Sequence, residues 1–390
     1  MFEDWDKQKL DTIAAAIKYP LQYMPMYHYE PRRWSIADTG KHQPEKEYYD
    51  PPENWDIPFE EIATPDKPGT FIGFKMYTAL GYKPLDSRLN QTLTGFYGKC
   101  EQEGIPVLCH CSPSGMCTHD RKLYFDLDKS TKSDYKRKFW FDRKTDWYYD
   151  EFVSPAAWEK QVLKKFNNLT LCLAHFGGGS SGWADWKNNT INKTWAQREN
   201  GDGPWNDVTK EDEIRFISDW YHKKDHDKPQ WIKQFVDLME KKDGNSYKYP
   251  NFYTDISYHF IKDHQKEFLW IIENHPIVKE RVMFGTDWYM TELDKKSIGD
   301  FVGEAKPIID GISEKLEAKT GIRDDLWLRF TRVNPMKFYG IRGIADKFGE
   351  GLALALVTNK KKLKRKCNVT KLNKSTLDKN LKVIKDSDFY

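Results

Sequence analysis

Residues 281–288, Arg281-Val-Met-Phe-Gly-Thr-Asp-Trp288, decide how the fold of this chain is interpreted. The apolar residues 282–284 form a short buried strand, and Gly285 then leads almost directly to Asp287. A carboxylate in this position lies at the C-terminal end of its strand, where parallel α/β proteins form their active sites. The alternative is that Asp287 caps the helix that follows. This stretch alone leaves both interpretations open, and the rest of the chain decides between them.

Five other segments have the same character of a strand followed by a helix. The six strands are expected to begin near residues 22, 70, 105, 169, 251 and 281. Continuous apolar strands joined by helices indicate a parallel sheet covered by helices, either a closed barrel or an open doubly wound sheet. Two long insertions, at residues 118–150 and 177–229, both follow the C-terminal end of a strand. They are therefore expected to lie over the same mouth of the sheet.

Composition excludes several classes of function. The 390 residues include 62 basic and 59 acidic side chains, so the net charge of +3 gives no reason to expect nucleic-acid binding. No apolar run approaches the roughly 20 residues that span a bilayer. The acidic N-terminus does not resemble a signal peptide, which indicates a cytoplasmic protein. The six cysteines are then expected to be free thiols rather than disulfides. Cys111, Cys117 and His119 are close in sequence, but their spacing fits no standard structural zinc motif.

Chemically active side chains gather at the ends of the predicted strands. These residues are Lys75, His110, His175, Asp255 and Asp287. Side chains alternate faces along a strand, so Gly73, Lys75 and Tyr77 are expected on one face of theirs, and Leu171, Leu173 and His175 on one face of theirs. Two histidines and a carboxylate are a common catalytic zinc shell. The sequence contains no glycine-rich dinucleotide motif, no P-loop and no nucleophile elbow. The pattern therefore favours a divalent-metal site, with zinc or manganese as the ion.

Several of these motifs, taken in order, resemble the amidohydrolase-related family. They are Gly73-Phe-Lys-Met-Tyr77, Gly81-Tyr-Lys-Pro-Leu-Asp86, Pro106-Val-Leu-Cys-His-Cys-Ser112, Leu173-Ala-His-Phe-Gly-Gly178, Phe252-Tyr-Thr-Asp-Ile-Ser257, Phe284-Gly-Thr-Asp-Trp288 and Asn334-Pro-Met-Lys-Phe-Tyr-Gly340. The family consists of metal-dependent hydrolases and decarboxylases built on a (β/α)8 TIM barrel. The resemblance covers roughly residues 20–342.

The resemblance implies a role for each matching residue. His110 would be the metal ligand at the end of the fifth barrel strand. His175 would bind the metal or polarise the substrate, and Asp287 would bind the metal and take a proton from its water. Lys75 would end the fourth strand and bind a metal or a substrate carboxylate. The residues expected to contact substrate are Lys75, Tyr77, Arg32, Asp255 and Trp288.

One departure from the family pattern changes the expected fold. The family's first strand carries His-x-His, and this sequence contains no such motif; His28 and Glu30 come nearest. The chain is therefore expected to form an incomplete barrel of about six parallel strands over residues 1–342, with helices outside. Residues 343–390, which include the basic run 360–366, are expected to form a poorly ordered tail. A sheet that lacks two strands has two unpaired edges, which a second copy or a partner chain would complete.

The expected function is a metal-dependent hydrolase of the amidohydrolase type, or the related decarboxylase. In this chemistry a metal-activated water attacks a carbonyl of a small carboxylated or aromatic substrate. A metal-free barrel relative that serves as a binding or structural protein is the alternative. A carbohydrate-active barrel that uses Asp255 and Asp287 as paired carboxylates is a third.

Overall fold

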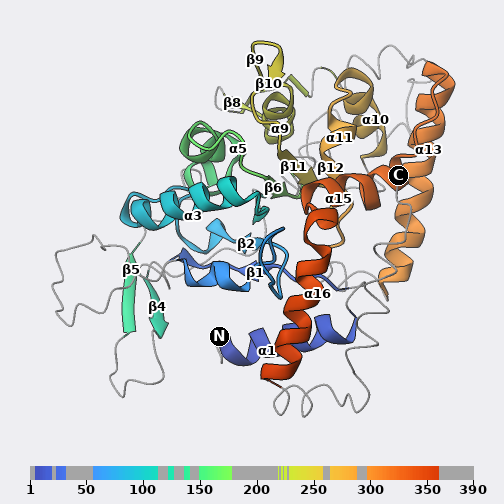
Figure 1. Cartoon of the computed structure of the whole chain (residues 1–390). Coiled ribbons are helices and arrows are strands. Elements are labelled where there is room, and N and C mark those ends of the chain that lie inside the picture. The colour runs from blue at the N-terminus through green and yellow to red at the C-terminus, as the bar shows by residue number, and fades with distance from the viewer. Residues whose placement is uncertain are drawn as a thin grey trace.

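The computed structural model is built around a parallel sheet of six strands (Figure 1). It describes residues 5–19, 23–31, 56–112, 122–126, 136–140, 149–177, 218, 221–222, 224–225, 228–257, 264–287 and 297–359. The sheet strands are β1 (Tyr27–His28), β2 (Phe74–Met76), β3 (Val107–His110), β6 (Leu171–Ala174), β11 (Phe252–Asp255) and β12 (Val282–Met283).

The spatial order of these strands is the order in which they occur in the sequence, β1-β2-β3-β6-β11-β12. Every pairing between neighbours is parallel. A doubly wound sheet reverses its strand order at a switch point, whereas a barrel adds each new strand beside the previous one. The sheet therefore has the winding of a partial TIM barrel, and β1 and β12 form its two ends in the part of the chain that the structure describes. The predicted fold class, with six strands, is confirmed.

Helices connect the strands and surround the sheet. Figure 1 shows the sheet in the middle of the molecule, with α1 crossing α16 at the bottom of the view. The helices are α1 (Trp5–Lys18), α3 (Asn90–Glu103), α5 (Pro155–Trp158), α9 (Trp231–Glu240), α10 (Gln265–Asn274), α11 (Val278–Arg281), α13 (Ile298–Thr320), α14 (Leu326–Leu328), α15 (Asn334–Phe338) and α16 (Ile341–Thr358). Residues 159–163 and 329–333 extend α5 and α14 as π-helical turns.

The two faces of the sheet differ in character, as the alternation of side chains predicts. Phe74, Val107 and Leu171 are buried in the large core that the helices cover. The opposite face carries a smaller apolar cluster, which includes Tyr253 and Cys172. Lys75 and His110 belong to this second face, because they alternate with buried core residues along their strands. Lys75 and His110 thus lie on the face that is inside the incomplete barrel.

The outer edge of β12 is covered by the segment that follows α14. Phe284 N–H donates to the Phe330 carbonyl at 2.9 Å. The Asn334 side-chain amide donates to the carbonyls of Val282 at 2.6 Å and Lys279 at 2.8 Å. An unpaired strand edge exposes main-chain donors and acceptors, and here Phe330 and Asn334 bind one donor and one acceptor of that edge. This gives Asn334, the first residue of one of the family-like motifs, a structural role.

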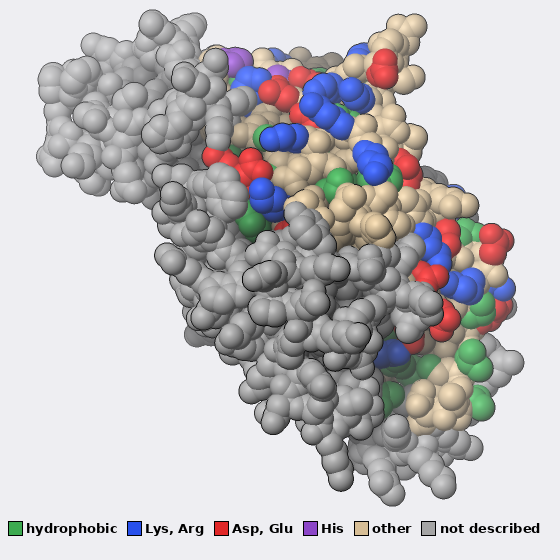
Figure 2. All heavy atoms as spheres, turned by 90° about the vertical axis from the view of Figure 1, so that its left-hand side faces the viewer, with side chains coloured by type: hydrophobic (Ala, Val, Ile, Leu, Met, Phe, Trp, Pro, Cys, Tyr) green, Lys and Arg blue, Asp and Glu red, His purple; other side chains and the backbone are tan. Residues whose placement is uncertain are grey.

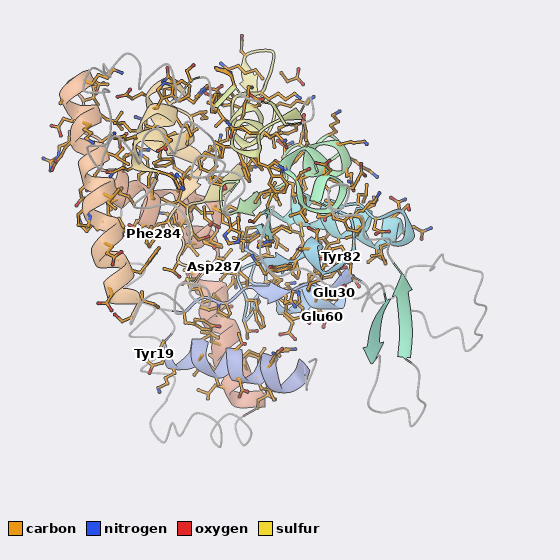
Figure 3. All side chains as sticks on the ribbon, turned by 180° about the vertical axis from the view of Figure 1, so that it is seen from behind. Tyr19, Glu30, Glu60, Tyr82, Phe284 and Asp287 are labelled. Carbon is orange, nitrogen blue, oxygen red and sulfur yellow. The ribbon has the colours of Figure 1, made fainter. Side chains whose placement is uncertain are left out.

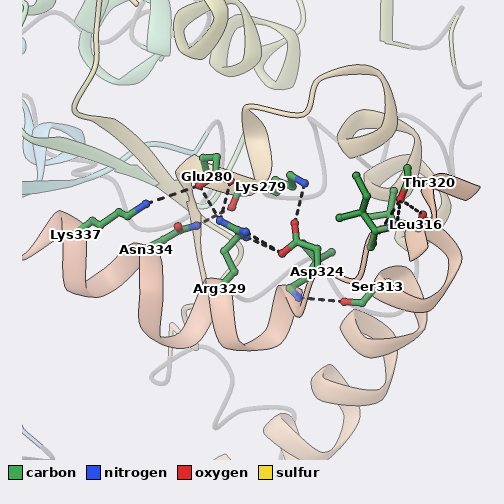
Figure 4. A network of polar contacts seen from close by, with 11 residues as sticks. Lys279, Glu280, Ser313, Leu316, Thr320, Asp324, Arg329, Asn334 and Lys337 are labelled. Carbon is green, nitrogen blue, oxygen red and sulfur yellow. Dashed lines mark hydrogen bonds and ion pairs between the residues drawn. The ribbon is translucent and has the colours of Figure 1, made fainter. Parts of the chain in front are cut away.

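Ion pairs fix the covering segment in place (Figure 4). Asp324 accepts from Lys279 at 2.7 Å and from Arg329 at 2.9 Å. Arg329 also donates to both oxygens of Glu280 at 2.8 Å. Burial would raise the pKa of Asp324, but the hydrogen bonds from Lys279 and Arg329 outweigh it and lower that pKa. The network therefore ties α11 to the turn that carries Phe330.

Several short elements lie between these strands and helices. Residues 57–61 form a 3-10 helix. The first insertion contains an antiparallel hairpin of β4 (Lys122–Asp126) and β5 (Lys136–Trp140), and the second contains β7 (Lys224–Asp225) and β8 (Lys228–Pro229). A further hairpin pairs β9 (Lys242–Asp243) with β10 (Ser246–Tyr247).

The C-terminal boundary differs from the expected one. Helix α16 runs through position 342, and its buried residues Ile344, Phe348 and Leu352 join the main core. The apolar residues of α16 recur at helical spacing up to the basic run, so the last helix of the domain extends past the predicted boundary. Residues 360–390 lie outside the described part of the chain.

The described surface carries both signs of charge. On the face shown in Figure 2, basic and acidic side chains are interspersed among neutral ones, as the net charge of +3 leads one to expect. Among the described helices, none combines the length and the apolar character needed to cross a membrane.

Candidate active site at the C-terminal ends of the strands

Four neighbouring strands bring polar residues to one end of the sheet. β3 ends at His110, β6 ends one residue before His175, β11 ends at Asp255, and β12 is followed by Asp287. These strands are adjacent in the order β3-β6-β11-β12. Side chains at the C-terminal ends of neighbouring parallel strands lie close together, so the strand order alone brings these four residues together.

Backbone strain is concentrated at the same C-terminal ends of the strands. Within the described ranges, the non-glycine residues with positive φ are His175 at 75°, Phe176 at 37° and Asp287 at 41°. Each such residue costs about 1–3 kcal/mol and persists only where its surroundings hold it. Asp255 Oδ1 accepts from the His175 N–H at 3.1 Å, and Thr254 Oγ1 accepts from the Phe176 N–H at 3.1 Å. Strand β11 therefore holds the strained turn that follows β6.

The strain corrects one detail of the sequence interpretation. Alternation places His175 on the same face as Leu171 and Leu173, which the structure buries in the helix-covered core. The left-handed conformation at His175 breaks the alternation, and the imidazole instead contacts His110 and Ser257.

The two histidines belong to a continuous chain of hydrogen bonds. Nδ1 of His110 and Nε2 of His175 are 3.0 Å apart. Nδ1 of His175 is 2.6 Å from Ser257 Oγ, which is itself 2.5 Å from Asp255 Oδ1. The Tyr77 ring stacks on His110 with a centroid distance of 4.5 Å and an interplanar angle of 8°. His110, His175, Asp255 and Ser257 are all buried.

Asp287, labelled in Figure 3, is half-buried and lies near enough to Asp255 to feel its charge. Its pKa is raised, first by burial and then by the charge of Asp255, while the charge of Lys75 acts in the opposite direction. Gly285 lets the turn before Asp287 approach closely, since a Cβ at this position would lie 3.0 Å from the Ser257 Cβ. Asp287 is therefore a carboxyl group that holds its proton to higher pH than an ordinary aspartate.

Lys75 supplies positive charge at the same place. Its side chain is half-buried on the inner face of β2. Burial and the charge of Asp255 raise the pKa of the buried Cys172 thiol, and the charge of Lys75 acts to lower it, as it does for Asp287. The charge of Lys75 thus faces a region that also contains two carboxylates.

The structure brings together most of the residues that the sequence singled out. Lys75, Tyr77, His110, His175, Asp255 and Asp287 all belong to this region. Arg32 and Trp288 lie outside the described residues, as do Cys117 and His119. The Cys111 thiol donates to the Val153 carbonyl at 3.0 Å.

The donors of this region fall short of a complete metal site. A catalytic zinc takes three protein ligands in addition to water or substrate. Among the described residues, no group of three or more histidine, cysteine, aspartate or glutamate side chains could hold a metal ion. Of the predicted ligands His110, His175 and Asp287, the two histidines are hydrogen-bonded to each other, with 3.0 Å between Nδ1 of His110 and Nε2 of His175. The assignment of all three as metal ligands stays a prediction.

Ser257 is the residue that the sequence analysis did not assign to the site. The sequence does carry a signal, because Asp255 and Ser257 are two positions apart and therefore share one face of their strand. The signal is weak, since serine is frequent at strand ends and only the fold shows that His175 lies next to it.

Comparisons with known proteins add little to this site. No family model matches the chain, and neither does any curated protein. Among solved structures, the chain is similar to a crystal structure of 2,6-dihydroxybenzoate decarboxylase complexed with 2,6-dihydroxybenzoate, with a TM-score of 0.35 and 13% sequence identity over 86% of this chain and 76% of that chain. A similarity this weak leaves the amidohydrolase relationship a suspected one and assigns no activity to the chain.

Proposed function

We propose that this chain is an enzyme of the amidohydrolase type, which hydrolyses or decarboxylates a small carboxylated substrate at the C-terminal ends of β3, β6, β11 and β12. One observation supports this proposal most strongly. The described non-glycine residues with strained backbone, His175, Phe176 and Asp287, lie where two histidines and two carboxylates meet. Strain of this kind clusters at active sites, because a packed core has no use for it.

Substrate binding would depend on Lys75. An ammonium group on the inner face of a sheet attracts a carboxylate, and the interaction is stronger there than in bulk water. Tyr77 follows Lys75 at the end of β2 and stacks on His110, so it adds an aromatic wall. These groups suit a substrate that carries both a carboxylate and a planar ring or carbonyl.

Proton transfer would depend on Asp287. In hydrolysis, the Asp287 carboxylate takes a proton from a water molecule, whose oxygen forms a bond to the substrate carbonyl. The C–N or C–O bond then breaks, and the leaving group receives the proton from Asp287. The raised pKa suits this role, because a general acid–base is most effective when its pKa is near the working pH.

Decarboxylation would use the same groups in another order. Protonated Asp287 gives its proton to the ring carbon that bears the carboxylate. The C–C bond breaks, its electron pair remains with the ring, and carbon dioxide leaves. Lys75 holds the carboxylate until that bond breaks. Both reactions, as described, use only residues of this chain and no metal.

The predicted zinc or manganese cofactor is a separate part of the proposal. His110 and His175 would supply two of its ligands, and a bound metal would supply Lewis-acid activation of the carbonyl. Metal analysis of the purified full chain tests this directly. About one zinc or manganese per chain is expected, and none after reconstitution would refute the metal assignment without affecting the roles of Lys75 and Asp287.

A turnover screen tests the enzymatic proposal. Aromatic carboxylic acids would be followed by carbon dioxide release, and carboxylated amides and lactones by the appearance of acid. Each is tested with and without added zinc or manganese. Turnover of at least one class is expected. Absence of turnover in every arm would favour the alternative, a binding protein without catalysis.

A further inference from the structure

We propose that Ser257 is a positioning residue that fixes the tautomer of His175, so that Nε2 of His175 carries the lone pair directed at His110. The proposal deepens the function proposed above and rests on it for its catalytic meaning. Its basis is the hydrogen-bonding capacity of each group in the chain Asp255–Ser257–His175–His110.

Asp255 is the acceptor in its hydrogen bonds with His175, Ser257 and Cys172. Its Oδ1 lies 3.1 Å from the His175 backbone nitrogen and 3.2 Å from the Ser257 backbone nitrogen, and a peptide N–H can only donate. The Cys172 thiol donates weakly to Oδ2 at 3.9 Å. Oδ1 already accepts two hydrogen bonds, so the 2.5 Å contact with Ser257 Oγ is a third, donated by the serine hydroxyl.

The hydroxyl of Ser257 has a single hydrogen, and Asp255 receives it. Ser257 Oγ is therefore an acceptor toward His175 Nδ1, 2.6 Å away. Nδ1 must carry a hydrogen to make this contact. In a neutral imidazole only one nitrogen is protonated, so Nε2 of His175 is the acceptor nitrogen.

The acceptor nitrogen of His175 faces His110. Nε2 is 3.0 Å from His110 Nδ1, which must then donate. His110 is consequently protonated on Nδ1 and carries its own lone pair on Nε2. The chain of hydrogen bonds thus has one direction, from His110 toward the Asp255 carboxylate, and it sets the tautomers of both histidines.

The same carboxylate also holds the backbone on which His175 depends. Asp255 Oδ1 binds the His175 N–H, where φ is 75°, and the Ser257 hydroxyl. The left-handed backbone and the ring tautomer are therefore fixed by one oxygen atom. These groups are all buried, and hydrogen bonds between buried groups are stronger because water does not compete for them. A fixed tautomer lets a histidine present one nitrogen to a ligand or a reacting group, and in this chain of hydrogen bonds that nitrogen is Nε2 of His110.

Long-range 1H–15N correlation spectra of the full chain, labelled with 15N-histidine, read the tautomers directly. The sample contains EDTA, and a His175→Gln spectrum assigns the His175 signals by their loss. Wild-type His175 is expected to be protonated on Nδ1 and unprotonated on Nε2, and His110 is expected to show the same tautomer. A His175 protonated on Nε2, or averaged between both forms, would overturn the proposal whatever the variants do.

Ser257→Ala and Ser154→Ala form a matched pair of variants. Ser154 is also a buried serine whose hydroxyl caps a helix, but it does not belong to this chain of hydrogen bonds. Loss of the fixed His175 tautomer is expected in Ser257→Ala alone. An unchanged tautomer in a folded Ser257→Ala variant would also refute the role of the hydroxyl.

Failure of this proposal can be told apart from failure of the proposed function. The tautomer is measured without substrate, whereas the function is measured by turnover. Once a substrate is known, Ser257→Ala is expected to lower kcat by about 10- to 100-fold with little change in KM. The Ser154→Ala variant is expected to keep wild-type kcat.

Discussion

Substitution of Gly285 by alanine would place a methyl group against the pair of residues that holds His175. The new Cβ would lie 3.0 Å from the Ser257 Cβ and 3.3 Å from Asp255 Oδ1. Ordinary carbon contacts are about 3.5–4.0 Å, so the two segments must separate by roughly half an ångström. Overpacking of this kind costs about 1–3 kcal/mol of unfolding free energy. The hydrogen bonds of Ser257 would lengthen at the same time.

Urea denaturation of the Gly285→Ala variant measures this cost, and Gly303→Ala is its control. Gly303 lies in α13, where an added Cβ would meet nothing within 4 Å. Alanine in an open helical position is expected to stabilise the fold by about 0.5–1 kcal/mol. The two variants should therefore move the unfolding midpoint in opposite directions. If Gly285→Ala is as stable as the wild type, the close approach of this turn to Ser257 and Asp255 is wrong.

Three further predictions concern the edge cover, the ion pairs and the charge at the site. Asn334→Ala should lower the free energy of unfolding by about 2–3 kcal/mol, because the hydrogen bonds to the carbonyls of Val282 in β12 and Lys279 in α11 are lost. Equilibrium unfolding measures this loss. A loss under about 0.5 kcal/mol would refute the role of Asn334 in covering the edge of β12. Asp324→Asn should be destabilising at neutral pH, and the difference from the wild type should disappear as the pH falls through the lowered pKa of Asp324. A pH-independent difference in urea midpoints would contradict this. Lys75→Met should raise the pKa of Asp287 further, because the positive charge that stabilises its carboxylate is removed. Titration of the carboxyl group, followed by its 13C signal, measures this pKa. A lower pKa in the variant would show that Lys75 does not act on Asp287.

Much of the fold follows from patterns that are local in the sequence. Short apolar runs separated by segments of helical periodicity are sufficient to predict six parallel strands. The alternation of side chains on a strand correctly predicts that Lys75 and His110 turn away from the helices. Such patterns work because each strand must bury one face under helices, and the residue types record which face that is.

The remainder depends on contacts between distant segments. Alternation predicts the wrong side for His175, because the strand ends at Ala174 and a left-handed residue follows. That conformation is stable only because Asp255, 80 residues away, accepts its N–H. The role of Ser257 and the edge cover by Asn334 are likewise visible only when the strands are side by side. The metal prediction rests on residue types, and residue types do not show whether three ligands come close enough together to hold one ion.

The proposed function requires that Asp287 transfers the proton in a reaction at the C-terminal ends of the strands. Comparison of kcat for the wild type and Asp287→Asn, on the best substrate from the turnover screen, tests it most directly. Asparagine tolerates the left-handed backbone at this position, so the variant should fold. A fall in kcat of about 10²- to 10⁴-fold is expected for the loss of a general acid–base. An Asp287→Asn enzyme with wild-type kcat would contradict the account.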